Sequence, residues 1–268
     1  MDEVRELKRW TRTGAAVTAE ALLAAVGVSQ PSVLLLLGHM RSGSTLLLHL
    51  LLTHPAVAAL GERNAVYASR GDLARLALAT RASARAPLRR LRYVADQVNH
   101  NRFTPNSWLL GDPRVRVLFM LRKPEASLVS LLELSRIHYE GSWSALGAVN
   151  YYVERLGFLT KLAASLPSAK CAALVTYETL TDSPQQTLEA LRIYLELQHG
   201  FSQTYSTQPF TGSRGDPGPN IRVGRILRRQ STPSVDLERC DLQRATEAYV
   251  GCREALARFA LCGMPARE

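Results

Sequence analysis

The stretch that decides the fold covers residues 32–52 and reads SVLLLLGHMRSGSTLLLHLLL. Its opening apolar run ends at Gly38 and is typical of a strand that is buried on both faces of a parallel sheet. Residues 46–52 are rich in leucine and favour a buried helix, which must end before Pro55. The sequence therefore predicts a strand, a glycine- and serine-rich loop and a helix in succession.

The loop at residues 38–45 reads GHMRSGST and matches part of a phosphate-binding pattern. Loops that hold nucleoside triphosphates follow G-x-x-x-x-G-K-[ST], and their lysine reaches the terminal phosphates. Both glycines and Thr45 have that spacing here, but Ser44 replaces the lysine. Successive backbone N–H groups and the start of a helix still favour an anion, and Arg41 adds positive charge. We therefore expect a phosphate-like ligand, without transfer of a terminal phosphoryl group.

Further strands and helices alternate along the chain. A second apolar run at residues 115–121 predicts a buried strand, and Pro124 suits the first turn of the helix that follows it. Similar patterns predict a helix near 144–165, a third strand at 172–177 and a helix from Pro184. Strands separated by helices predict an α/β fold, here a single three-layer domain with a central parallel sheet flanked by helices, as in phosphate-loop proteins.

The remaining segments of the single domain, residues 1–268, carry weaker patterns. Residues 1–30 predict one or two short amphipathic helices ahead of the core, and residues 71–100 are expected to be helical. Residues 198–234 are rich in Gly, Pro, Ser and Arg, which is typical of a functional or mobile loop. A last helix is expected within residues 235–268.

The composition is that of a basic globular protein with 268 residues and a net charge of +10. Hydrophobic residues make up 46% of the chain, which excludes a disordered protein. Only four of the 33 basic residues are lysines, so arginine supplies nearly all of the positive charge. Because a guanidinium group binds phosphate or carboxylate through two parallel donors, anionic partners are expected.

The four cysteines form no CxxC pair and no zinc-ligand pattern with histidine. This favours free thiols in a reducing compartment and no metal site. The N-terminus has mixed charges, and no run approaches the ~20 apolar residues of a membrane span. We therefore expect a soluble, cytoplasmic protein that does not bind membranes.

Three motifs in order resemble those of the sulfotransferases that use 3′-phosphoadenosine 5′-phosphosulfate. The first is the loop Arg41-Ser42-Gly43-Ser44-Thr45-Leu46, which resembles the family's 5′-phosphosulfate loop. The second is Arg122 at the end of a strand with Ser130 eight residues on, which resembles the 3′-phosphate motif. The third begins with Tyr177 and resembles a stretch that closes on the nucleotide. The resemblance implies that these residues bind the donor, and that the enzyme needs no metal.

A finer resemblance is to the branch that contains the tyrosylprotein sulfotransferases and many bacterial relatives. In that branch the loop helix is followed by His-Pro and then by Gly-Glu, as His54-Pro55 and Gly61-Glu62 follow it here. The resemblance implies that Glu62 is the general base, which suits a carboxylate whose pKa is raised by partial burial.

The segment at residues 100–105 departs from the family pattern. Members often place a Lys or His just ahead of a Pro there, but Phe103 occupies the matching position. Arg102, one position away, or Arg41 is then left to supply the positive charge. His100 is the alternative general base, and its other interpretation is a solvated loop histidine.

Many sulfotransferases also carry a basic, glycine-containing loop that folds over the nucleotide late in the chain. By this resemblance, Arg222 and Arg225 are candidates for contact with the 3′-phosphate. The alternative for both residues, and for Arg228 and Arg229, is a solvated basic helix face.

The function predicted from these patterns is sulfuryl transfer to a hydroxyl of a small-molecule, sugar or phenolic acceptor, with adenosine 3′,5′-bisphosphate as the other product. A kinase or nucleoside triphosphatase with a degenerate loop is the first alternative, but Arg122 rather than an acidic residue ends the second strand. A basic nucleic-acid-binding protein ranks last, because aromatics make up only 7% of the chain. We therefore expect no nucleic-acid partner. The oligomeric state stays open, with a homodimer among the options.

Overall fold

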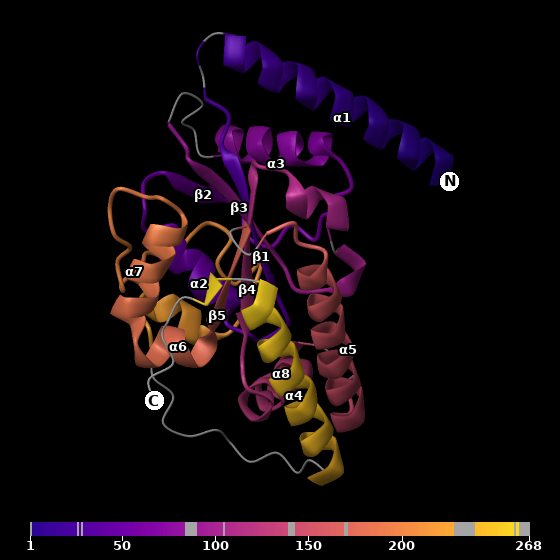
Figure 1. The fold of residues 1–268 in the computed structure, drawn as a ribbon, viewed down its shortest axis with the longest axis vertical. Coiled ribbons are helices and arrows are strands. Elements are labelled where there is room, and N and C mark those ends of the chain that lie inside the picture. The colour runs from indigo at the N-terminus through magenta and orange to yellow at the C-terminus, as the bar shows by residue number, and fades with distance from the viewer. Residues whose placement is uncertain are drawn as a thin grey trace.

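A parallel sheet forms the centre of the molecule (Figure 1). The computed structural model describes residues 2–25, 27, 29–83, 90–103, 105–138, 143–168, 171–227, 239–259 and 261–262. Within them the sheet has six strands in the order β2-β3-β1-β4-β5-β6. These are β1 (Ser32–Gly38), β2 (Val57–Ala59), β3 (Tyr93–Val98), β4 (Val115–Leu121), β5 (Ala172–Thr176) and β6 (Leu261–Cys262). All neighbouring pairs are parallel, so the strands end at the same edge of the sheet.

Helices cover both faces of this sheet and complete the predicted three-layer α/β domain (Figure 1). One face carries α2 (Ser44–Leu51), α6 (Tyr177–Asp182) and α7 (Pro184–Tyr194). The other carries α3 (Arg70–Ser83), α4 (Pro124–His138), α5 (Ala145–Ala164) and α8 (Arg239–Phe259). The first helix, α1 (Asp2–Ala25), packs against α3. The described residues also form 3-10 helices at η1 (Asn101–Phe103), η2 (Ser107–Gly111) and η4 (Pro219–Val223). In the described part of the chain, no helix has the length and apolar character needed to cross a membrane.

Strand β1 is buried on both faces, which explains its unbroken apolar sequence. Leu34 and Leu36 belong to the core under α2 and α7, whereas Leu35 and Leu37 belong to the core under α3, α5 and α8. All four side chains have no exposed surface. Because β1 lies between β3 and β4, the loop that follows it emerges at the centre of the sheet edge.

The expectation that residues 71–100 are helical was wrong in its second half. Helix α3 ends at Ser83, and the segment Tyr93–Val98 is strand β3, which pairs with β1 over six residues. The polar side chains of Asp96 and Gln97 interrupt its apolar pattern, yet both are buried. The pairing with β1 overrides the helical composition of this stretch.

Smaller differences occur at the other ends of elements. The N-terminal region forms one long helix, α1, rather than one or two short ones. Tyr177 begins helix α6 and does not end strand β5. Two strands of two or three residues, β2 and β6, carry no recognisable sequence pattern. Residues 198–227 include η4 and an isolated bridge between Thr204 and Arg225, and residues 228–238 lie outside the described part.

A buried arginine on α5 fastens the ends of β1 and β3 together. Arg155 has no exposed surface. Its guanidinium donates to Gly38 O at 2.8 Å and to Val98 O at 2.6 Å, and a third bond reaches Asn101 Oδ1 at 2.9 Å. Burial lowers the pKa of Arg155 to about 10, so the group remains charged at neutral pH. The last carbonyls of two central strands thus depend on one side chain.

Replacing Arg155 by Met should lower the free energy of unfolding by about 3 kcal/mol or more, because two buried carbonyl groups would lose their donor. Urea unfolding at neutral pH measures the change. The matched control is Arg92→Met, which removes an exposed ion pair with Glu196 and should cost less than about 1 kcal/mol. Equal losses in the two variants would contradict a structural role for Arg155.

Candidate active site

A cavity of about 790 Å³ opens at the carboxyl edge of the sheet, above the ends of β3, β1, β4 and β5. The chain leaves β1 at a point where its neighbours connect in opposite directions, and open α/β sheets bind ligands at such a switch point. Eleven of the residues singled out in the sequence line this cavity: Arg41, Gly43, Ser44, Thr45, Leu46, Glu62, His100, Arg122, Ser130, Tyr177 and Arg225.

The loop after β1 adopts the tight turn that its glycines predict. Gly43 has φ of 94° and Arg41 has φ of 66°, so both lie in the left-handed region. A Cβ atom at Gly43 would lie 2.6 Å from Cδ2 of Tyr177, because that ring packs directly on the turn. Ser42 is fully buried under the loop and does not line the cavity.

Two buried side chains fix this loop to its surroundings. His39 Nε2 accepts from the Arg122 backbone N–H at 3.2 Å, and its Nδ1 lies 2.9 Å from Met40 O. Burial lowers the pKa of His39 to about 3, so the ring is neutral and Nδ1 carries the donated proton. The Tyr151 hydroxyl accepts from the Met40 N–H at 2.8 Å and donates to Asn99 O at 2.8 Å.

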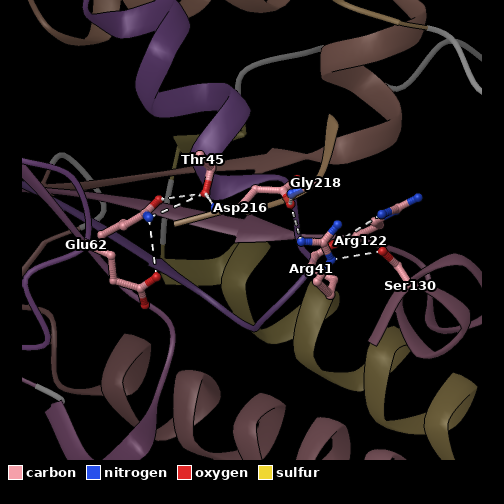
Figure 2. Close-up of polar contacts among 8 residues, drawn as sticks. Arg41, Thr45, Glu62, Arg122, Ser130, Asp216 and Gly218 are labelled. Atoms are coloured by element: carbon pink, nitrogen blue, oxygen red, sulfur yellow. Dashed lines mark hydrogen bonds and ion pairs between the residues drawn. The ribbon is translucent and has the colours of Figure 1, made fainter. Parts of the chain in front are cut away.

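The two predicted donor-binding motifs meet at Arg41 (Figure 2). Its Nε donates to Ser130 Oγ at 2.9 Å, and its backbone oxygen accepts from the Arg122 guanidinium at 3.2 Å. The Arg122 guanidinium also lies over the ring of Tyr177, 4.1 Å from its centroid. Such a cation–π contact orients the guanidinium without neutralising it. The guanidinium groups of Arg41 and Arg122 therefore lie on one side of the cavity.

Glu62 lies on the other side, where amide groups at the end of β3 and just after it hold both carboxylate oxygens. Asn99 Nδ2 donates to Oε1 at 3.1 Å, and Gln97 Nε2 donates to Oε2 at 3.4 Å. Burial raises the pKa of Glu62, while the bond from Asn99 and the charge of Arg155 oppose that rise. The result is an oriented, half-buried carboxylate at the cavity, which suits a general base.

Asn99 also connects this carboxylate to the loop after β1. Its Oδ1 accepts from Ser44 Oγ at 3.2 Å, while its Nδ2 donates to Glu62. One amide group thus spans the phosphate loop and the candidate base. The distance between the two is set by strand β3.

A fully buried carboxylate supports the Glu62 segment from below. Asp96 Oδ1 accepts from the backbone N–H of Arg63 at 3.1 Å, and Oδ2 accepts from the Tyr67 hydroxyl. Burial raises the pKa of Asp96 to about 7. The bond to Arg63 ties the residue next to Glu62 to β3. The backbone of the candidate base is therefore fixed, as are its two carboxylate oxygens.

Of the remaining residues predicted from the sequence, some line the cavity and others do not. His100 lines the cavity beside the Tyr151 ring, and burial lowers the pKa of its imidazole. Arg102 lies on η1, over the ring of Phe103, and is not among the residues that line the cavity. Arg225 lines the cavity, whereas Arg222 lies against the backbone of Gly212. Arg228 and Arg229 lie outside the described residues.

Three polar contributors to the site were missed in the sequence. Gln97 was missed because residues 71–100 were expected to be helical, and Asn99 because it indicated only a polar segment beside His100, although a polar pair after buried residues at a strand end is a recognisable signal. Asp216 lines the cavity and forms an ion pair with Arg41, yet its Asp-Pro-Gly context indicates only a turn. Among the described residues, no cluster of three His, Cys, Asp or Glu side chains could hold a metal ion.

Comparisons with known proteins give only distant likenesses. No protein-family model matches the sequence, and no curated protein matches it. The structure is similar to a mouse sulfotransferase, SULT7A1, complexed with PAP, at 8% identity over 90% of this chain and 73% of that one, with a TM-score of 0.44. It is also similar to a sulfotransferase domain from the curacin biosynthetic pathway, at 15% identity over 82% of this chain and 97% of that one, with a TM-score of 0.48.

Replacing Asn99 by Leu should raise the pKa of Glu62 further, because a donor to the charged carboxylate is lost while the burial stays. A titration of the side-chain carboxyl carbon by NMR measures the pKa, and its signal is assigned by its loss in Glu62→Gln. Asn150→Leu, which changes an asparagine bonded to Arg244, is the control. An unchanged or lower pKa in Asn99→Leu would contradict the proposed hold on the carboxylate.

Proposed function

We propose that the chain is a sulfotransferase that moves a sulfuryl group from 3′-phosphoadenosine 5′-phosphosulfate to a hydroxyl of a small-molecule, sugar or phenolic acceptor. The observation that carries the proposal is the bond between Arg41 Nε and Ser130 Oγ, which joins two motifs 89 residues apart. The anion-binding loop and the candidate 3′-phosphate residues therefore face one cavity. A donor with charged groups on two positions of its ribose needs that arrangement.

The side chains of the cavity suit such a donor. The backbone N–H groups of Gly43, Ser44 and Thr45 begin helix α2 and would hold the 5′-phosphosulfate. Arg122 and Ser130 would bind the 3′-phosphate, and Arg225 is a further cation at the same cavity. Guanidinium groups bind phosphate oxygens through paired donors, which fits a ligand with several of them.

The acceptor hydroxyl must lose a proton as its oxygen bonds to sulfur. When bound, the donor supplies a sulfuryl group that is already activated by its bond to a phosphate. Glu62 would take the proton, and Arg41 would offset the charge that develops on the bridging oxygen as the bond from that oxygen to sulfur breaks. Adenosine 3′,5′-bisphosphate would then leave. Catalysis in this scheme combines positioning with charge stabilisation.

His100 is the second candidate for the base, because its imidazole is neutral at neutral pH and lines the same cavity. Glu62 is preferred because both of its oxygens are held by amide donors. For His100, the described contacts are with aromatic rings, those of Phe103 and Tyr151.

Calorimetric titration should show that adenosine 3′,5′-bisphosphate binds more tightly than 5′-AMP or ATP, because only the bisphosphate carries a 3′-phosphate. Replacing Ser130 by Ala should reduce the preference for the bisphosphate over 5′-AMP by about tenfold or more, as expected for a lost bond to a charged group. Arg92→Met removes an exposed arginine and should leave the preference unchanged. Equal affinity of the wild type for the bisphosphate and 5′-AMP would overturn the 3′-phosphate assignment.

Replacing Glu62 by Gln should lower turnover by about 10²–10⁴-fold while the affinity for the bisphosphate stays near that of the wild type. Turnover is followed as transfer of radiolabelled sulfate from the donor to a panel of phenols and sugars. His100→Gln is tested in parallel. If Glu62→Gln keeps its turnover and His100→Gln loses it, the base is His100.

A further inference from the structure

An acidic side chain lies in the part of the cavity that the proposed function assigns to an anion. Asp216 Oδ1 is 2.6 Å from Nη1 of Arg41, and the two side chains are only 24% and 17% exposed. Figure 2 shows Asp216 between Thr45 and Arg41, the residues that would bracket the donor's 5′ end. A basic site that awaits an anionic ligand therefore already holds a carboxylate.

The carboxylate belongs to a turn that is tied to helix α2. The Asp216 backbone N–H donates to Thr45 Oγ1 at 3.1 Å, and Asp216 Oδ1 accepts from the Gly218 N–H at 2.8 Å. Earlier in the same segment, Thr211 Oγ1 lies 2.8 Å from Nε2 of the buried His49. We call residues 211–218 the late loop. Its two ends are thus joined to α2 by polar contacts at Thr45 and His49.

Two glycines let the late loop approach the site closely. Gly215 has φ of 134°, and a Cβ atom there would lie 2.9 Å from both Thr45 Oγ1 and Gln97 Nε2. Gly61 has φ of 80°, and a Cβ atom there would lie 2.9 Å from the Arg214 backbone oxygen. The N–H of Glu62 donates to that same oxygen at 3.3 Å. The late loop is therefore fitted against both the phosphate loop and the segment of the candidate base.

An anionic group beside Arg41 and the Asp216 carboxylate would repel each other at short range, in a site that is only partly exposed to water. While the ion pair lasts, Asp216 occupies the direction in which Nη1 of Arg41 would donate to the ligand. We propose that Asp216 is a latch: its ion pair with Arg41 holds the late loop closed in the ligand-free protein, and donor binding replaces that ion pair. The proposal rests on the proposed function, because it takes Arg41 as a ligand of the donor.

The latch has two consequences for the reaction cycle. Donor affinity is lower than the cavity alone would allow, since every binding event must first separate Asp216 from Arg41. Release of the bisphosphate is favoured for the same reason, because the carboxylate competes for Arg41 as soon as the product loosens.

The test compares the affinity for adenosine 3′,5′-bisphosphate of the wild type, Asp216→Asn and Glu189→Gln. The Asn side chain keeps an oxygen for the Gly218 N–H and leaves the backbone bond to Thr45 intact, so only the charge of the latch is removed. Glu189→Gln removes a carboxylate from an exposed pair on α7 and controls for the change in net charge. We expect about tenfold tighter binding in Asp216→Asn and no comparable change in the control. Equal or weaker binding by Asp216→Asn would overturn the latch.

A second measurement separates this proposal from the proposed function. If neither the wild type nor Asp216→Asn binds the bisphosphate, the assignment of the donor is wrong. The latch is then judged by amide hydrogen exchange in the ligand-free proteins. Faster exchange at the backbone N–H groups of residues 215 and 216 in Asp216→Asn supports the latch, and unchanged exchange there refutes it.

Discussion

The site depends on the way the last carbonyl groups of the central strands are satisfied. Gly38 and Val98 are the last residues of β1 and β3, and both are buried. The guanidinium of Arg155 bonds to the carbonyl oxygens of both residues and to Oδ1 of Asn101 in η1. Because buried carbonyls without partners are unfavourable, this one side chain lets two strands stop at the same level beneath a cavity. The bonds from Arg155 to the ends of β1 and β3 therefore also position the loop after β1 and the amide groups at the end of β3.

The charges of the cavity are separated by the order of the strands. Arg122 follows β4 and Arg41 follows β1, so guanidinium groups gather toward one side. Glu62 is held by Gln97 and Asn99 from β3, on the opposite side of β1. A carboxylate placed among those arginines would form an ion pair and lose basicity. Its distance from them lets burial raise its pKa instead.

Much of the fold could be predicted from the sequence because its central strands are buried on both faces. Mostly apolar runs marked β1, β4 and β5, and the leucine-rich and proline-led stretches marked α2, α4 and α7. Strand β3 could not be found in this way, since two of its six residues are Asp96 and Gln97, whose side chains serve the site and not the core. The loss of β3 also hid Asn99, and with it the contact that orients Glu62.

Residues of the candidate site were predicted best where the local backbone conformation of a short motif determines their positions. The turn at Gly43 and the eight-residue step from Arg122 to Ser130 each bring a residue to the cavity with no information from elsewhere. Residues of the late part of the chain lack such local rules. Arg222 and Asp216 are both polar and both lie near glycines, yet only Asp216 reaches the cavity, and tertiary contacts alone distinguish them.

The absent side chain at Gly43 has a wider effect than permitting a turn. The ring of Tyr177 fills the space where a Cβ of residue 43 would be. The same ring also supports the Arg122 guanidinium, which lies over it. Three segments that are far apart in the sequence are therefore stacked as turn, ring and cation. A single methyl group at position 43 would act as a wedge at the base of this stack. It would displace a charge more than 70 residues away in the chain, although the methyl group itself is neutral and small.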